Sequence, residues 1–385
     1  MITRRDFLKA SMMVAAGSRA AASAGVLAGA KDASASSPPA SPAPEWRNKQ
    51  PEMRYRRLGR TGFMISEIVC GGDPISPTAN RHVQLAMDMG LNYLDTSPGY
   101  GNGKSEMGYS SVIQGANRER VFITTKVTPF CPNRVDAYRK ILAGLSADEQ
   151  AAVLRQANDD MERRGASLPN YLGNYFPQQY QDAMSSAIAN VLEKKYGNKI
   201  DRRETYMDTI FSSVEGSLQR LKTDHVDLLM CPHGATSPAE VQVPEIFEAF
   251  EKLRQQGKVR FLGVTSHSDP AGVLKTALNS GVYSAAMVAF NVVNRSYLEP
   301  VVEEAHKRDF GVIAMKVARC VHDLDDPKRP MPERATLMNS LEPGDTPLPV
   351  KAYRFMLKNP QLSAVISCMV NEQMVRENLA LVRAA

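Results

Sequence analysis

Four polar residues lie where apolar, strand-like stretches of this chain should end, and their types suit proton transfer. They are Asp95, Tyr100, Lys126 and His233. Burying a charged or titratable group is costly unless it is paired, so several such groups at strand ends indicate a shared site. A Lys–Asp pair beside a Tyr favours proton donation, because the Lys cation stabilises the phenolate and lowers the Tyr pKa from about 10. With a His to orient a carbonyl oxygen toward the phenol, the set suits carbonyl reduction.

Eight apolar, β-rich stretches alternate with amphipathic segments, which predicts strands alternating with helices. The predicted strands span residues 65–70, 91–96, 121–127, 226–232, 260–266, 285–291, 311–317 and 364–369. Asp269 caps a predicted helix that stops near Gly281, and Pro244 opens another that ends before Gly257. Eight such units predict an α/β fold, a closed (β/α)8 TIM barrel, in which chemistry takes place at the carboxyl ends of the strands.

The chain resembles the aldo/keto reductase family from about Met53 to Asn378. The motifs that carry the resemblance follow one another in the family's order, and they are YRRLGRTGFMISEIVCGG, GLNYLDTSPGYGNGKSE, VFITTKV, SLQRLKTDHVDLLMCPH, GKVRFLGVTSHS and NPQLSAVIS. The resemblance implies that the four polar residues form a catalytic tetrad, with Tyr100 as general acid and base. It also implies an N-terminal β-hairpin that plugs the barrel floor. The implied nicotinamide cofactor would bind without a Rossmann fold, and the sequence contains no GxGxxG motif.

The resemblance further assigns cofactor contacts to Thr265, Ser266, Met315, Lys316, Glu377 and Asn378. Thr265 and Ser266 stand where the family usually has Ser and Asn, which hold the nicotinamide carboxamide. Met315 stands where an aromatic ring commonly stacks on the nicotinamide. These departures are variations within the family's pattern, and the resemblance still implies a nicotinamide site.

The identity of the nicotinamide cofactor is left open between NADP and NAD. Lys316 is expected to meet a phosphate, and Glu377 with Asn378 matches the pair that contacts adenine. NADPH-preferring relatives often clamp the 2′-phosphate with Lys, Ser and Arg or Gln, and loss of those groups weakens the clamp. The residues at the corresponding positions here are Cys368, Met369 and Met374.

The first 35 residues read as a twin-arginine signal peptide. TRRDFLK, residues 3–9, is followed by an Ala-rich stretch that ends in small residues. Residues 36–52, rich in Ala, Ser and Pro, predict a disordered linker before a barrel domain at 53–385. We therefore expect the twin-arginine translocation machinery as a partner, a periplasmic location and no stable membrane anchor. Because nicotinamide cofactors are cytoplasmic, we expect a tightly held cofactor that is carried outward and recycled.

Residues 129–200 read as a helical insertion after the third strand. Ser146 and Glu149 form a predicted capping box for a helix over 146–164, and a second helix is predicted over 178–196. An insertion at this point emerges on the catalytic face, so a lid or substrate wall is one interpretation. The aromatic residues between and within these helices either stack on substrate or pack the helices onto the barrel, and they are Tyr171, Tyr175, Phe176 and Tyr180. A dimer contact is the third alternative for this insertion.

Composition excludes some classes of partner. The net charge is +6, and the basic residues are spread among acids without a basic stripe, so no nucleic acid partner is expected. The chain has five cysteines, an odd number without CxxC spacing, which indicates buried thiols and no metal, with one disulfide left open. His267 is expected to be a polar group of the pocket.

These features together predict an NAD(P)-dependent oxidoreductase that interconverts a carbonyl group and an alcohol by hydride transfer. The expected substrate is a small aldehyde, ketone or keto-sugar. The alternative is an exported sugar- or ligand-binding barrel, or a non-redox enzyme, that has lost cofactor turnover and keeps the buried ion pair for stability.

Overall fold

The computed structural model describes residues 42–173, 175–323, 325–326 and 329–383, so the predicted export signal lies outside the described residues. Within these ranges eight parallel strands close into a barrel in the order β10-β11-β4-β5-β6-β7-β8-β9. The strands are β4 (Ile68–Gly71), β5 (Tyr93–Asp95), β6 (Phe122–Lys126), β7 (Val226–Met230), β8 (Val259–Ser266), β9 (Ala285–Ala289), β10 (Gly311–Met315) and β11 (Ala364–Ser367). The prediction of a closed (β/α)8 barrel is confirmed.

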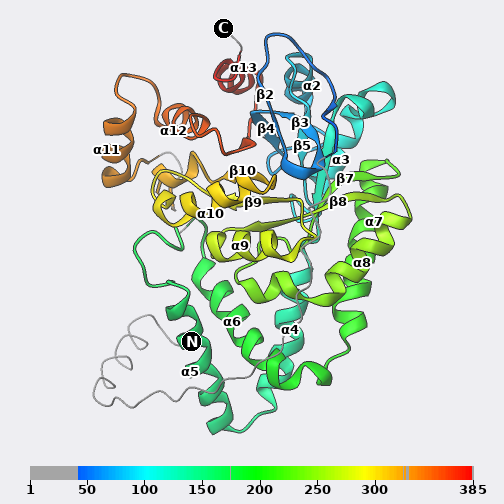
Figure 1. Ribbon diagram of the computed structural model, residues 1–385, viewed down its shortest axis with the longest axis vertical. Helices are drawn as coiled ribbons and strands as arrows, with labels where there is room; N and C mark the ends of the chain where they lie inside the picture. Colours follow the sequence, from blue (N-terminus) through cyan, green and yellow to red (C-terminus); the bar gives the residue numbers. More distant parts are fainter. Residues whose placement is uncertain (1–41, 174, 324, 327–328, 384–385) are drawn as a thin grey trace, which may run out of the picture. The chain divides into compact units, whose positions relative to one another are not determined.

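Each barrel strand is followed along the chain by at least one helix. These helices are α2 (Arg81–Asp88), α3 (Lys104–Val112), α7 (Thr209–Leu221), α8 (Pro244–Gln255), α9 (Pro270–Ser280), α10 (Arg295–Lys307), α12 (Leu348–Leu357) and α13 (Glu372–Ala380), with α11 (Pro332–Leu341) ahead of α12. Figure 1 shows helices such as α7, α8, α9 and α10 on the outside of the strands. The predicted cap of α9 is present, because the Asp269 carboxylate accepts a hydrogen bond from the Gly272 N–H and Gly281 ends the helix at φ 74°. None of the described helices is long and apolar enough to cross a bilayer.

Shorter helical segments connect the larger elements. The 3₁₀ segments are η1 (Gly59–Thr61), η2 (Gly115–Arg120), η3 (Gly197–Lys199), η5 (Pro238–Gln242) and η6 (Arg319–Val321), and η4 (Arg203–Asp208) is a π-helical turn.

A small sheet, in the order β1-β3-β2, lies at the amino-terminal end of the barrel. It contains β1 (Glu45–Trp46), β2 (Tyr55–Arg57) and β3 (Phe63–Ser66). Leu58, Phe63 and Ile65 are fully buried and share one apolar cluster with interior residues of the barrel strands, so the predicted floor-plugging hairpin is present. The strand predicted over 65–70 is divided at Glu67, because its first part pairs within this small sheet and its second part enters the barrel.

The packed structure begins before the predicted domain boundary at residue 53, because charges at the barrel floor hold the preceding segment. Asp227, in β7, has no exposed side-chain surface, and Arg47 and Arg118 contact its carboxylate at 3.1 and 3.0 Å. Burial alone would raise the pKa of Asp227, but these two arginines hold it below its ordinary value. Part of the predicted linker is therefore an ordered component of the barrel floor.

Three further helices lie between β6 and α7, where the sequence predicted an insertion. They are α4 (Phe130–Ala143), α5 (Ala147–Arg163) and α6 (Gln179–Tyr196). The predicted capping box is present at the start of α5, and α6 lies between α4 and α5 (Figure 1). Two buried hydrogen bonds join α6 to the loop after β7, from Ser186 to Glu240 at 2.7 Å and from Asn190 to Ser237 at 2.9 Å. The three helices are therefore anchored at the carboxyl end of the barrel.

Candidate active site

A buried ion pair joins the ends of two neighbouring strands. Lys126 ends β6, and its Nζ lies 2.6 and 2.7 Å from the two carboxylate oxygens of Asp95, which ends β5. The same ammonium donates to the carbonyl oxygen of Thr96 at 2.8 Å, and both charged side chains are 1% exposed. Burial raises the pKa of Asp95 and lowers that of Lys126, while each partner's charge opposes that shift. The two-oxygen contact keeps the charges together in the barrel mouth.

Tyr100 lies against this ion pair. It sits in the turn between β5 and α3, where the Tyr100 N–H donates to the Ser97 carbonyl oxygen at 3.1 Å. The Nζ of Lys126 lies 4.5 Å from the centroid of the Tyr100 ring, a cation–π distance. The lysine thus faces the ring of the tyrosine while its own hydrogen bonds go to Asp95 and Thr96.

The predicted direction of the Tyr100 pKa shift is wrong. The pKa of Tyr100 lies well above 10, because burial disfavours the phenolate and the Asp95 carboxylate repels it. Lys126, which the sequence expected to lower this pKa, directs its hydrogen bonds to Asp95 and to the Thr96 carbonyl oxygen. Tyr100 is therefore a phenol at neutral pH, the form that can donate a proton.

His233 approaches Tyr100 from the loop after β7. The two ring centroids are 6.1 Å apart in an edge-on arrangement, and the His233 Nδ1 lies 2.9 Å from the Thr128 hydroxyl oxygen. Burial, with the nearby cations of Lys126 and Lys316, lowers the pKa of His233 to about 3. The imidazole is thus neutral at ordinary pH and carries one N–H donor.

Thr265 and Ser266, assigned above to the cofactor, hold the loop that carries His233. The Gly234 N–H donates to the Thr265 hydroxyl oxygen at 2.7 Å, and the Ser266 hydroxyl donates to the Ala235 carbonyl oxygen at 2.6 Å. The proton of the Ser266 hydroxyl is therefore used within the protein. Thr265 acts here as an acceptor, which leaves its own proton available to a ligand.

The remaining assigned cofactor residues lie on two other strands. Met315 ends β10 and is 7% exposed within the interior apolar cluster, and Lys316 follows it at a left-handed φ of 60°. Burial lowers the pKa of Lys316, and the Asp73 carboxylate opposes that shift. On α13, the buried Asn378 donates to the Ser367 hydroxyl at the end of β11, at 2.9 Å.

Glu377 differs from the other assigned residues, because it is exposed and accepts a hydrogen bond from Gln373 within its own helix. The structure thus brings the four tetrad residues to one end of the barrel, with Lys316 close enough to His233 to affect its pKa. Glu377 stands apart from them on α13.

The aromatic residues of the 129–200 segment divide into two groups. Tyr171 and Tyr175 are buried, and their hydroxyls contact the Asp269 carboxylate and the Asn291 amide respectively. They pack the segment onto the loops after β8 and β9. Phe176 is partly buried and lies edge-on to the ring of His267, with centroids 5.5 Å apart, whereas Tyr180 is 38% exposed.

His267 is a polar group with an unfilled capacity for hydrogen bonding. Its Nδ1 is buried and has no hydrogen-bond partner within the described part of the chain. Burial and the nearby Lys316 lower its pKa well below 6.5, so the ring is neutral. It contacts Phe176 and lies near enough to His233 and Lys126 for their charges to lower its pKa, which is consistent with the expectation of a polar group near the site.

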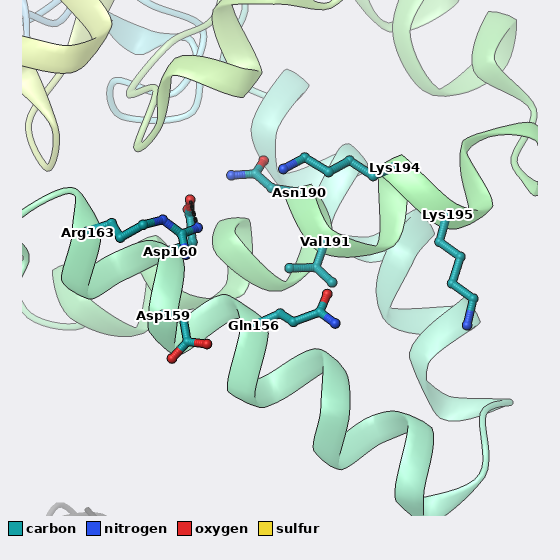
Figure 2. A pocket seen from close by; sticks show the side chains of 8 residues that line it. All are labelled: Gln156, Asp159, Asp160, Arg163, Asn190, Val191, Lys194 and Lys195. Carbon is teal, nitrogen blue, oxygen red and sulfur yellow. Dashed lines mark hydrogen bonds and ion pairs between the residues drawn. The ribbon is translucent and has the colours of Figure 1, made fainter. Parts of the chain in front are cut away.

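A hollow of about 370 Å³ lies between α5 and α6, as Figure 2 shows. Its lining side chains are Gln156, Asp159, Asp160, Arg163, Asn190, Val191, Lys194 and Lys195. It contains none of the four tetrad residues. The candidate site is therefore identified by the titratable residues of the tetrad, which lie close together, and not by the hollow between α5 and α6.

The cysteines and carboxylates do not form a metal site in the described ranges. No group of three or more His, Cys, Asp or Glu side chains within them is placed to hold a metal ion. All five cysteines are free thiols. The disulfide that the sequence left open is therefore not formed.

Sequence reasoning missed two hydroxyl groups, those of Thr128 and Ser97. The Thr128 hydroxyl oxygen lies 2.6 Å from that of Ser97 and 2.9 Å from the His233 ring. The position of Thr128 could have been predicted from its spacing, because it comes two residues after Lys126. In an extended chain, side chains two residues apart point to the same side. Ser97 lies in the same turn as Tyr100.

An eight-stranded parallel barrel with titratable side chains gathered at one end is the architecture of a (β/α)8 enzyme. The chain belongs to the aldo/keto reductase family of oxidoreductases, whose family model matches residues 71–166 and 191–384. The unmatched residues between these ranges include the loop after α5 and the first two-thirds of α6.

Individual relatives agree with this assignment. The uncharacterized oxidoreductase YqkF of Bacillus subtilis is 24% identical over 348 residues, covering 85% of this chain and 90% of the relative. L-galactose dehydrogenase of Arabidopsis thaliana is 23% identical over 222 residues, covering 56% of this chain and 49% of that protein.

Solved structures share the fold. The aldo-keto reductase AKR11C1 from Bacillus halodurans, in its holo form, has a TM-score of 0.56 at 21% identity and covers 86% of this chain and 92% of its own. An aldo-keto reductase from Klebsiella pneumoniae in complex with NADPH has a TM-score of 0.54 at 17% identity, covering 86% and 89%.

The lowered pKa of His233 predicts a dependence of stability on pH. Between pH 6.5 and about 3 the unfolded chain binds a proton at His233 that the folded chain does not, so the free energy of unfolding falls as pH falls. His233→Gln should make that slope shallower by at most about 1.4 kcal/mol per pH unit. Urea denaturation from pH 7.5 to 4.5 measures both slopes. Equal slopes for the wild-type protein and His233→Gln would contradict the prediction.

Proposed function

We propose that the protein is an NAD(P)-dependent oxidoreductase that interconverts a small carbonyl compound and its alcohol, with Tyr100 as general acid and base. The arrangement of Lys126 carries the proposal, because its ammonium bonds both oxygens of Asp95 and faces the ring of Tyr100. The Tyr100 ring in turn lies edge-on to that of His233. An ion pair kept only for stability requires neither the phenol nor the imidazole.

The residues of the site have distinct roles in reduction. Tyr100 donates its phenolic proton to the carbonyl oxygen as that oxygen gains negative charge, and the Tyr100 phenolate takes a proton back in alcohol oxidation. His233 donates a hydrogen bond to the same oxygen from its neutral ring. Asp95 holds Lys126 in place, so that its positive charge lies beside the phenolate formed on Tyr100.

The raised pKa of Tyr100 favours the reductive direction at neutral pH. Reduction needs the protonated phenol, which is the form that burial and Asp95 favour. Oxidation needs the phenolate, so its rate rises with pH as Tyr100 ionises.

The residues present fit a nicotinamide cofactor at the carboxyl end of the barrel. When bound, the reduced cofactor supplies the hydride that the carbonyl carbon receives. Thr265 has a hydroxyl proton available for the carboxamide, Met315 offers an apolar surface to the ring, and Lys316 offers a positive charge to a phosphate. Solved structures from Klebsiella pneumoniae that share the fold contain NADPH or NADP, which supports NADP, and NAD is the alternative.

The 129–200 segment supplies one wall of the proposed substrate pocket. Arg164 at the end of α5 donates to the Thr236 carbonyl oxygen at 2.8 Å and to the Asp269 carboxylate at 3.2 Å, which holds the segment across the loops after β7 and β8. Phe176 then faces His267 beside the tetrad. An apolar ring beside an unpartnered imidazole suits a substrate with both apolar and hydroxyl-bearing parts, such as a keto-sugar.

Replacement of the phenol tests the proposed function. Tyr100→Phe should lower kcat for NADPH-dependent carbonyl reduction at least about 100-fold, because the proton donor is lost, and leave nucleotide Kd within about twofold. Consumption of NADPH with a panel of aldehydes, ketones and keto-sugars measures turnover, and titrations with NADPH and NADH measure binding. Tyr180→Phe removes an equivalent hydroxyl on the exposed part of α6 and should behave as wild type. Full activity in Tyr100→Phe would refute the proposed role, and absence of nucleotide binding by the wild-type protein would favour the binding-barrel alternative.

The proposed contact of Phe176 with substrate gives a second prediction. Phe176→Ala should raise the KM for the carbonyl substrate about 10-fold or more, because even one methylene-sized apolar contact with a substrate contributes about 1–3 kcal/mol. The nucleotide Kd should not change. Tyr180→Ala, in the same segment at a side chain that is 38% exposed, should alter neither constant. An unchanged KM in Phe176→Ala would show that this segment only packs against the barrel.

We also propose export through the twin-arginine pathway, on the basis of residues 3–9. Export of a folded protein is compatible with a captive cofactor. Replacing Arg4 and Arg5 together by lysine should retain the full-length protein in the cytoplasm, whereas replacing Arg19 should not. Immunoblots of periplasmic and cytoplasmic fractions distinguish the outcomes, and unimpaired secretion of the double-lysine variant would disprove the proposal.

A further inference from the structure

A continuous chain of hydroxyl groups connects the Tyr100 turn to His233. The Gly99 N–H donates to the Ser97 hydroxyl oxygen at 3.1 Å, and the Ser97 and Thr128 hydroxyl oxygens are 2.6 Å apart. The Thr128 hydroxyl oxygen lies 2.9 Å from the Nδ1 of His233. Ser97 is fully buried, so its hydroxyl is not exposed to bulk solvent.

The backbone N–H at the start of this chain sets the direction of every hydrogen bond in it. A backbone N–H is always a donor, so Ser97 accepts from Gly99 and has its own proton left to donate. Its hydroxyl neighbour in the described structure is Thr128, which then accepts from Ser97 and donates to Nδ1 of His233. The opposite direction would leave the buried Ser97 proton without an acceptor among the described residues, which is costly.

From this geometry we infer that Ser97 and Thr128 are positioning residues that select one tautomer of His233. A neutral imidazole whose Nδ1 accepts a hydrogen bond carries its proton on Nε2. The hydroxyl chain therefore keeps Nε2–H as the donor that His233 presents to the carbonyl oxygen. This inference rests on the proposed function for its catalytic consequence, but the tautomer itself does not depend on turnover.

The same contacts also fix the distance between the Tyr100 phenol and the His233 imidazole, the two groups proposed to bind the carbonyl oxygen. Gly99 approaches Thr128 so closely that a Cβ at Gly99 would lie 2.9 Å from the Thr128 methyl carbon. The turn that carries Tyr100 thus rests directly on the residue that orients His233. The hydroxyl chain couples the position of the phenol to the position of the imidazole.

Nitrogen-15 NMR of histidine-labelled protein tests the inference directly. Two-bond proton–nitrogen correlations distinguish an imidazole protonated on Nε2 from one protonated on Nδ1, and the spectrum of His233→Gln identifies the His233 signals. The wild-type ring should be the Nε2–H tautomer. Thr128→Val, which keeps the side-chain shape and removes the hydroxyl, should give a mixture of both tautomers. Ser97→Ala should shift the ring signals in the same direction by a smaller amount.

Kinetics give the matching catalytic readout. Thr128→Val should lower kcat about 10- to 100-fold with nucleotide Kd unchanged, the range typical of partners that orient a functional histidine. Thr128→Ser, which restores the hydroxyl, should recover most of the activity and the single tautomer. Thr336→Val is the matched control, because the Thr336 hydroxyl bonds only the Pro332 carbonyl oxygen within α11.

The outcomes separate this inference from the proposed function. A wild-type ring protonated on Nδ1, or a Thr128→Val protein with an unchanged tautomer and unchanged kcat, would overturn the inference. A wild-type protein with the Nε2–H tautomer but no turnover on any carbonyl would support the hydroxyl chain and count against the proposed function alone.

Discussion

The ion pair between Lys126 and Asp95 is the interaction on which the rest of the site depends. Both side chains are almost fully buried, so each charge is tolerated only because the other lies within 2.7 Å. Removing one partner of such a pair typically costs about 3–5 kcal/mol, because the remaining charge stays buried without compensation. Barrel closure places the pair, since β5 and β6 are neighbours and end at the same rim. The ring of Tyr100 then lies over the ammonium of Lys126, whose Nζ is 4.5 Å from the ring centroid.

The same low-polarity environment shifts the two neighbouring groups in opposite directions. Burial raises the pKa of Tyr100 and lowers that of His233, because it disfavours a phenolate and an imidazolium alike. At neutral pH both groups are therefore uncharged hydrogen-bond donors. Two neutral donors beside a buried cation suit an oxygen that gains negative charge during a reaction.

The segment between β6 and α7 departs from the family pattern and packs against the loops of the barrel. The family match is interrupted at residues 167–190, and the described part of this stretch contacts the barrel through side chains and not through the sheet. Tyr175 bonds to Asn291, and Tyr171 to Asp269, so the segment is attached to loops that follow two different strands. Loops of a barrel tolerate such changes because the strands carry the fold, which leaves substrate choice free to vary.

Much of the secondary structure depends on interactions between residues close in sequence, so it could be predicted from the sequence. The alternation of apolar stretches with helices, the cap at Asp269 and the capping box at Ser146 depend on interactions within a few residues, and all are present. The placement of Asp95 and Lys126 at strand ends followed from the same pattern. The ordered segment around Arg47 could not be predicted, because its partner Asp227 is 180 residues away.

Only the tertiary structure decided the electrostatics and the hydrogen-bond directions of the site. The sequence alone suggested a lowered pKa for Tyr100, and the structure reverses it, because burial and the Asp95 carboxylate disfavour the phenolate. Likewise the hydroxyls of Ser97 and Thr128 meet only because β5 and β6 lie side by side. Residue types and spacing determine which groups reach the rim of the barrel. Desolvation and the direction of hydrogen bonds arise only when chain segments distant in sequence come together.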